Sequence, residues 1–354
     1  MIIYIVTVII VVLTEPFLTL FLPKRKVKKA YILCVGMWMF LVLSLRSETV
    51  GNDLDNYLPR YILFGNTPWI RLPDTANKKA TEIGYAVINK LLFYLNASPR
   101  TLLVFAAFIM IWLLCLRIYT DSPIPRLSFI IYIGLSLYTS AFSGLRQSIA
   151  TAVFMYAYKY LKNRDFVKYC MVIVLASTIH KSILVVIPLY FLVDIKIDMK
   201  KSLCFLAAFG MCWLLGEKII SFIASNFKYE NYVTDLGSGG GAVGLLVIYL
   251  SFLASIFLLQ KNYNAIESRI YIYSLFILTL FTILTFSLSI TTRIMSYFNA
   301  LIVITLPTCI ARTKNTGNRK IMSCVYSVML LAYYFLIICR ADTSGIIPYE
   351  FMWN

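Results

Sequence analysis

The sequence has almost no histidine and no closely spaced pair of cysteines. His180 is its only histidine, and none of its eight cysteines form a Cys-x-x-Cys motif. Protein zinc sites need several such ligands at short spacings, so a metal centre is not expected. The cysteines lie in or beside apolar runs, where a free cysteine acts as a small buried hydrophobe. The sequence therefore predicts neither a metal nor a cofactor.

Charged residues are also scarce, and acidic ones are the scarcest. They make up 14% of the chain, with 33 Lys and Arg against 16 Asp and Glu, for a formal net charge of +17. The basic residues stand between apolar runs, where they fix orientation and meet anionic lipid headgroups. We therefore expect the lipid bilayer as a partner and no nucleic acid.

Apolar residues make up 60% of the chain and form runs long enough to cross a bilayer as helices. Lipid offers no partner to backbone N–H and C=O groups, and these continuous runs lack the alternation of barrel strands. The runs lie near 2–22, 30–46, 101–118, 127–145, 147–161, 202–216, 242–260, 270–290, 294–311 and 321–339. This pattern predicts an all-α polytopic integral membrane protein with about 11–12 membrane segments.

The segment 169–193 can be one long helix or a broken helical hairpin, because the polar residues 178–182 interrupt it. If it is a hairpin, 20 of the 33 basic residues fall in short cytoplasmic loops, as the positive-inside rule requires. A single helix would invert the sidedness of every later loop. We therefore predict a short broken or re-entrant hairpin, with both chain ends outside.

The chain 1–354 is then a single transmembrane domain with three external segments. A large external loop covers 46–100 and contains an apolar stretch, 83–95, suited to the membrane interface. A second external loop covers 217–241, and an external tail covers 341–354.

Ionisable residues at the outer ends of spans, or in the large loop, are candidates for function because burying them is costly. They are Arg46, Asp53, Asp55, Glu82, Arg146, His180 and Arg293, with Gln147 beside Arg146. The chain has no Gly-x-Ser-x-Gly motif, which argues against a serine hydrolase. The grouping predicts one polar site open to the outside.

Three of these residues are arginines, whose planar guanidinium can pair with two phosphate oxygens and stays charged. A carboxylate or histidine beside them can accept a proton from a hydroxyl nucleophile. Together they indicate glycosyl transfer from a polyprenyl-diphosphate sugar. Simpler roles remain open: Arg46 can anchor at the interface, His180 can be a hydrogen-bonded helix-tip residue, and Asp53 can be a solvated loop carboxylate.

At these residues the chain resembles the EpsG family of Wzy-type polysaccharide polymerases, from about Arg46 to the C-terminus. The matching pieces are Arg46, Gly51-Asn52-Asp53, Tyr57, Glu82-Ile83-Gly84-Tyr85, Phe142-Ser143-x-x-Arg146-Gln147-x-x-Ala150, His180-Lys181-Ser182, Arg293-x-x-x-Tyr297-Phe298 and Pro348-Tyr349. Leu54 departs from the pattern, in which a small polar residue follows the aspartate.

The resemblance implies a glycosyltransferase of the bacterial inner membrane that joins undecaprenyl-diphosphate-linked oligosaccharide repeats at the periplasmic face. Undecaprenyl diphosphate would leave as the growing chain moves to a new repeat. The product would be O-antigen, capsule or exopolysaccharide, and a chain-length regulator and a flippase are implied as partners. A flippase, an O-antigen ligase and a membrane acyltransferase are the alternatives, although flippases usually have related halves and no internal repeat is found.

The predicted site residues fall into three groups. Arg146 and Arg293, assisted by Arg46, bind the diphosphate. Glu82, Asp53 or His180 is the base, with Glu82 favoured because it begins the apolar stretch 83–95; its alternative role is to interact with that helix's dipole. The supporting residues are Gln147, Ser143, Tyr57 and Tyr297.

Overall fold

The computed structural model describes residues 1–96, 98–198, 205, 207, 209–211, 240–259, 265–285, 291–313, 315–340 and 345–353. These residues form helices, and their only β-type pairing is an isolated bridge between Arg46 and Phe351. The predicted all-α polytopic membrane protein is thus confirmed. The predicted span 202–216 and the external loop 217–241 lie almost entirely outside the described residues.

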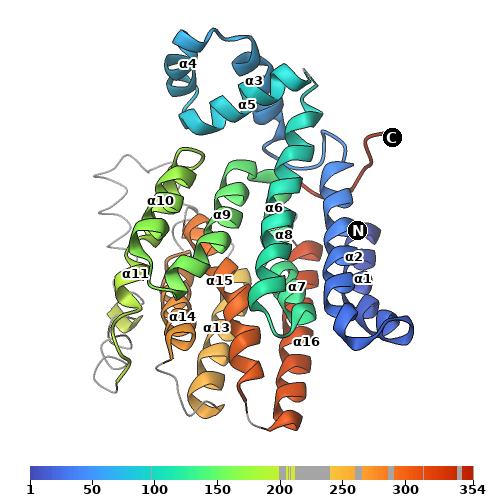
Figure 1. Ribbon diagram of the computed structural model, residues 1–354, viewed down its shortest axis with the longest axis vertical. Coiled ribbons are helices and arrows are strands. Elements are labelled where there is room, and N and C mark those ends of the chain that lie inside the picture. Colours follow the sequence, from blue (N-terminus) through green and yellow to red (C-terminus); the bar gives the residue numbers. More distant parts are fainter. Residues whose placement is uncertain are drawn as a thin grey trace.

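The long apolar helices form a bundle (Figure 1). Six are long and apolar enough to cross a membrane. They are α1 (Ile2–Phe21), α2 (Lys24–Ser44), α6 (Arg100–Asp121), α14 (Ile266–Leu284), α15 (Thr291–Ala311) and α16 (Thr316–Arg340). In α15, 78% of the most apolar stretch is buried, against 22% in α1, so α15 is a central helix and α1 a peripheral one. Two further helices of the bundle are α9 (Leu145–Lys162) and α13 (Gly240–Leu259).

The run 127–145, expected as one span, is broken into α7 (Pro125–Gly134) and α8 (Leu137–Ser143). The break is at Ser136, whose φ of +59° is left-handed and cannot continue a helix. The Ser136 carbonyl accepts bonds from both the backbone N–H and the hydroxyl of Ser140, which starts the new helix. Gly144 then separates α8 from α9, so a short helix and a turn stand at the end of the bundle that holds the site.

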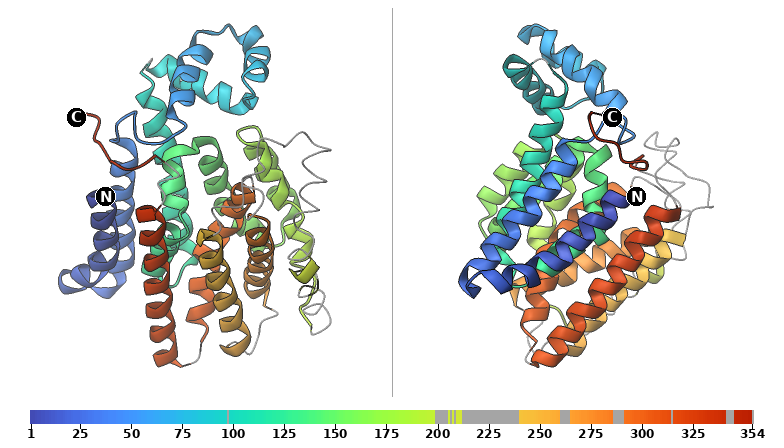
Figure 2. Two further views of the ribbon diagram at one scale, coloured as in Figure 1. Left: turned by 180° about the vertical axis from the view of Figure 1, so that it is seen from behind. Right: turned by 90° about the vertical axis from the view of Figure 1, so that its right-hand side faces the viewer.

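Residues 46–100 form a small helical subdomain, which we call the cap. It contains α3 (Leu54–Asn66), the 3-10 helix η1 (Trp69–Arg71), α4 (Leu72–Lys78) and α5 (Ile83–Leu95). Its helices project beyond one end of the bundle, as the two views of Figure 2 show. The cap has its own small core of Phe64, Leu72, Ala76 and Ala86. The buried Lys90 ammonium donates to the carbonyls of Gly65 and Thr67 and so ties α5 to the end of α3.

The segment 166–192 folds back on itself as α10 (Phe166–Ser177), η2 (Lys181–Val186) and α11 (Leu189–Leu192). The Tyr169 hydroxyl donates to the Val186 carbonyl at 2.7 Å, and Arg164 pairs with Asp194, so the two arms run antiparallel. Its tip docks on the cap, where a Cβ at Gly84 would lie 2.1 Å from the Thr178 hydroxyl. Only glycine therefore fits at position 84. How this segment sits in the membrane stays a prediction.

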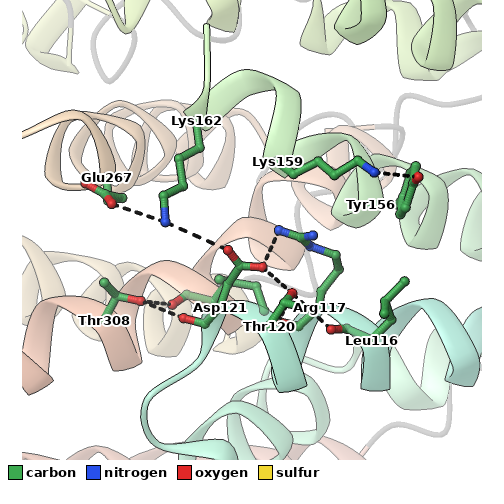
Figure 3. A network of polar contacts seen from close by, with 10 residues as sticks. Leu116, Arg117, Thr120, Asp121, Tyr156, Lys159, Lys162, Glu267 and Thr308 are labelled. Atoms are coloured by element: carbon green, nitrogen blue, oxygen red, sulfur yellow. Dashed lines mark hydrogen bonds and ion pairs between the residues drawn. The ribbon is translucent and has the colours of Figure 1, made fainter. Parts of the chain in front are cut away.

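At the end of the bundle opposite the cap (Figure 1), ion pairs join α6, α9, α14 and the residue that follows α15. Figure 3 shows Asp121, Lys162 and Glu267 of this network. Asp121, at the end of α6, pairs with Arg117 and lies 3.8 Å from the Lys162 ammonium of α9. Glu267 of α14 lies 3.3 Å from the same ammonium and 2.9 Å from the guanidinium of Arg312, just beyond α15. Because these carboxylates are shielded from water, their pairs are stronger than exposed ones.

The Glu267→Gln variant should lower the thermal stability of the protein in detergent, because two cations lose their shared carboxylate. We expect a loss of about 1–2 kcal/mol in the free energy of unfolding, given that both cations are partly exposed. The matched control is Glu15→Gln, since Glu15 pairs with Arg126 at 3.5 Å on the surface. Equal shifts in melting temperature for the two variants would show that the network adds nothing beyond a surface pair.

Candidate functional site

A cavity of about 210 Å³ opens where the cap meets the hairpin tip, α9 and α15. Nine residues line it: Asp53, Asn56, Tyr57, Arg60, Gly144, Arg146, Gln147, His180 and Arg293. The sequence predicted six of them, which come from four segments far apart in the chain. Asn56, Arg60 and Gly144 were missed.

The cap contributes four of the lining residues from one helix face. Asp53 precedes α3, and Asn56, Tyr57 and Arg60 follow at spacings of three, four and seven residues. Side chains at these spacings lie on the same side of an α-helix. Asn56 and Arg60 could have been predicted from this spacing relative to Asp53. That prediction requires knowing that residues 54–66 form a helix, because the spacing places side chains on one face only in a helix.

Glu82 connects the cap, α9 and the hairpin tip. Its Oε2 accepts a bond from Arg146 Nη1 at 2.5 Å. Its Oε1 accepts from the backbone N–H of Lys181 at 3.1 Å and lies 3.6 Å from Nδ1 of His180. The carboxylate therefore contacts two residues that line the cavity, Arg146 and His180. Glu82 itself is not among the described residues that line it. Glu82 is the N-cap residue of α5, as the alternative role required, but its side chain makes no capping bond.

The surroundings of Glu82 lower its pKa. Burial alone would raise the pKa of this carboxyl group. Its contacts with His180 and the Lys181 N–H, together with the Arg146 charge, outweigh burial and bring the pKa to about 2. Glu82 is thus ionised at neutral pH and has little affinity for a proton.

Arg146 is held on several sides at the beginning of α9. Besides Glu82, its Nη1 contacts the Ala80 carbonyl at 3.4 Å, and its guanidinium carbon lies 5.9 Å from the ring centres of Tyr57 and Tyr85. The side chain is 18% exposed. A guanidinium that is fixed in this way is oriented before any ligand binds.

Polar contacts of the supporting residues join the other elements around the cavity. Gln147 donates through Nε2 to the Arg293 carbonyl at 2.9 Å, which links α9 to α15. The Tyr297 hydroxyl lies 2.8 Å from the Ser182 hydroxyl, which links α15 to the hairpin. The Ser143 hydroxyl accepts from the Asn52 N–H at 3.2 Å, which links α8 to the cap.

Arg46 was predicted to assist diphosphate binding, but it is not among the described residues that line the cavity. Its side chain is 1% exposed, and its guanidinium carbon lies 4.9 Å from the ring centre of Phe142. Burial, the largest effect, lowers the pKa of Arg46 to about 10. The Arg100 guanidinium donates to its carbonyl at 2.8 Å. Arg46 therefore occupies an aromatic environment behind the site, and Arg60 is the third arginine at the cavity.

The tail 345–353 fixes the loop that leads to Asp53. The Ser47 N–H donates to the Glu350 carbonyl, and the Gly51 N–H donates to the Gly345 carbonyl, both at 2.8 Å. Gly51 has a φ of +121°, and a Cβ there would lie 2.3 Å from the Phe142 carbonyl oxygen. A side chain at position 51 would push the loop away from α8, so the close contact depends on this glycine.

The cavity combines three guanidinium groups and an imidazole, with Asp53 as the one carboxylate among its described lining residues. No group of three or more potential metal ligands occurs in the part of the chain that the structure describes. Such a site can hold a phosphate-rich anion and accept a proton from a hydroxyl group.

Comparison with known proteins identifies a family. The family model described as the EpsG family matches residues 29–351. No curated protein and no solved structure matches the chain.

Proposed function

Because the chain belongs to the EpsG family, a Wzy-type polymerase-like family, we propose that it joins undecaprenyl-diphosphate-linked oligosaccharide repeats at the periplasmic face of the bacterial inner membrane. Family membership supports a glycosyltransferase-like polysaccharide polymerase in general. The lipid-linked substrate, the membrane face and a product such as O-antigen, capsule or exopolysaccharide belong to our proposal. So do a chain-length regulator and a flippase as partners.

The observation that carries the proposal is the grouping of arginines with His180 in one cavity at the cap. In the proposed reaction, a hydroxyl oxygen of the acceptor repeat attacks the anomeric carbon of the donor sugar. The bond from that carbon to the diphosphate oxygen breaks, and undecaprenyl diphosphate leaves with the electron pair. Arg146 and Arg293 bind the diphosphate and stabilise the charge that develops on it.

We assign the base to His180 rather than to Glu82. A base must take the hydroxyl proton, and a carboxylate with a pKa of about 2 does so poorly. His180 lines the cavity, with Glu82 3.6 Å from its Nδ1. The ionised carboxylate can stabilise the imidazolium that forms when His180 takes the proton. Asp53, which also lines the cavity, is the alternative base.

A flippase for the same lipid is less well supported. It needs a polar path that reaches both membrane faces, whereas the described cavity lies at the cap. At the opposite end, the Asp121 and Glu267 ion pairs join α6, α9 and α14 (Figure 3). An O-antigen ligase would use similar chemistry and must be separated by experiment.

A strain that lacks the gene for this protein should still attach single repeats to its surface lipid and lose all longer chains. A polymerase is needed only to join repeats, so attachment of one repeat does not depend on it. Gel analysis of the surface glycans, with the wild-type gene restored as the control, measures the result. Loss of every attached repeat would point to a flippase or a ligase instead.

A further inference from the structure

We propose that Arg60 of the cap binds the second phosphate of the donor and makes the site prefer a diphosphate over a monophosphate. This inference rests on the proposed function and extends it to a residue that neither the sequence motifs nor the family match assigns. Three observations support it. Arg60 is held by Thr81, the turn that contains Thr81 also holds Arg146, and the described residues that line the cavity include three arginines and one carboxylate.

Arg60 is positioned before a ligand arrives. It lies on the cavity-lining face of α3, and its Nη1 donates to the Thr81 hydroxyl at 3.2 Å. Thr81 is itself fixed, because its N–H donates to the Ala76 carbonyl at 2.9 Å and its hydroxyl to the Lys79 carbonyl at 3.1 Å. Thr81 is 7% exposed. One nitrogen of the guanidinium is thus anchored to the hydroxyl of a buried threonine, and Arg60 still lines the cavity.

The same turn holds Arg146. The turn 79–82 contributes Thr81 to Arg60, and the Ala80 carbonyl and Glu82 carboxylate to Arg146. Ala80 has a φ of +48°, so the chain bends sharply between these contacts. Two guanidinium groups from α3 and α9, which lie far apart in the sequence, are therefore anchored to three consecutive residues, Ala80, Thr81 and Glu82. This arrangement fixes the two groups relative to each other.

The charge of the cavity suits a diphosphate better than a monophosphate. Arg60, Arg146 and Arg293 line it, with Asp53 as the one carboxylate among the described lining residues. Glu82 is already paired with Arg146 and lies behind it. A guanidinium fork engages two oxygens of one phosphate group. Arg146 and Arg293 suffice for one phosphate, and a third cation from the cap meets the second.

The test compares farnesyl diphosphate with farnesyl monophosphate as ligands of the purified full-length protein in detergent, by calorimetric titration. The wild-type protein should bind the diphosphate at least about 10-fold more tightly than the monophosphate, since charge-assisted pairs are strong. Arg60→Ala should weaken diphosphate binding by about 10–100-fold and change monophosphate binding by less than about 3-fold. Arg71→Ala, which removes an exposed arginine of the same cap, should change neither.

Two further variants keep the test independent of folding. Arg60→Lys retains the charge without the fork and should recover only part of the preference. Thr81→Val removes the hydroxyl that anchors Arg60 but keeps the size of the side chain, and it should reduce the preference by a smaller factor. Equal loss of affinity for both ligands in Arg60→Ala, or an unchanged preference, would overturn the proposal. If the wild-type protein bound neither ligand and Arg146→Ala left the glycan ladder of the cells unchanged, the proposed function itself would fail.

Discussion

Replacing Arg146 with alanine should abolish polymer formation while the protein remains in the membrane. Arg146 is held at the cavity by Glu82, the Ala80 carbonyl and two tyrosine rings, and in the proposed reaction it meets charge that appears on the leaving diphosphate. Losing one such donor typically lowers a rate by about 100- to 1,000-fold. Arg146→Lys should recover little, because lysine keeps the charge but loses the planar fork. The glycan ladder and the amount of protein in membranes are measured together.

The control for this variant must separate catalysis from folding. Arg146→Ala removes the ion-pair partner of Glu82, which is 11% exposed. The double variant Arg146→Ala with Glu82→Gln removes both charges and should regain thermal stability without regaining activity. Arg126→Ala breaks a surface pair with Glu15 and should leave the ladder unchanged. Full-length polymer from Arg146→Lys would reduce Arg146 to an electrostatic anchor.

Replacing His180 with asparagine should lower the rate of polymerisation by about 100- to 10,000-fold, the usual contribution of a general base. Lipid-linked repeats should accumulate in these cells, since their supply does not depend on His180. Glu82→Gln should be milder, because glutamine can still accept the bond from the Lys181 N–H and only the carboxylate charge is lost. If Glu82→Gln removed all polymer and His180→Asn left it intact, the base would be Glu82.

Measuring the stability of the protein against pH tests independently whether the ionised Glu82 carboxylate stabilises the fold. The folded pKa of Glu82 is lowered from the usual 4.5 to about 2, so ionised Glu82 stabilises the folded protein. This stabilisation is complete above about pH 4.5 and is lost as the pH falls toward 2. The wild-type protein should exceed Glu82→Gln by roughly 1–2 kcal/mol at pH 7, after allowance for solvent screening, and the difference should shrink below pH 4.5. A difference that stays constant from pH 7 to pH 3 would contradict this account.

The sequence predicted the helices well where apolar residues run without interruption. Runs such as 2–22 and 101–118 are long and apolar enough to cross the lipid as helices, and α1 and α6 match them closely. It could not predict the break at Ser136, because serine is common in helices and the left-handed conformation there depends on packing. The run 127–145 is apolar on both sides of that break, so hydropathy gave no sign of it.

The residues that line the candidate cavity were predictable where polar residues interrupt apolar runs, as at Arg146, His180 and Arg293. The inclusion of Arg46 rested on the same signal, but the sequence does not reveal that distant residues enclose it. Its backbone pairs with Phe351, and its guanidinium lies over Phe142. Arg60 was overlooked for the opposite reason. It lies in a segment that was predicted as an external loop, where a charged residue attracts no attention.

The contacts of the tail have a consequence for the order in which the protein can be completed. Residues 46–53 are made early, yet their hydrogen-bond partners at Gly345 and Glu350 are synthesised about 300 residues later. The Tyr4 hydroxyl, from the first helix, likewise waits for the Ile346 carbonyl. A partly synthesised chain therefore inserts its helices without the support that sets the Asp53 loop. Activity should begin only once residues 345–353 have joined the cap, so unfinished chains should be inactive.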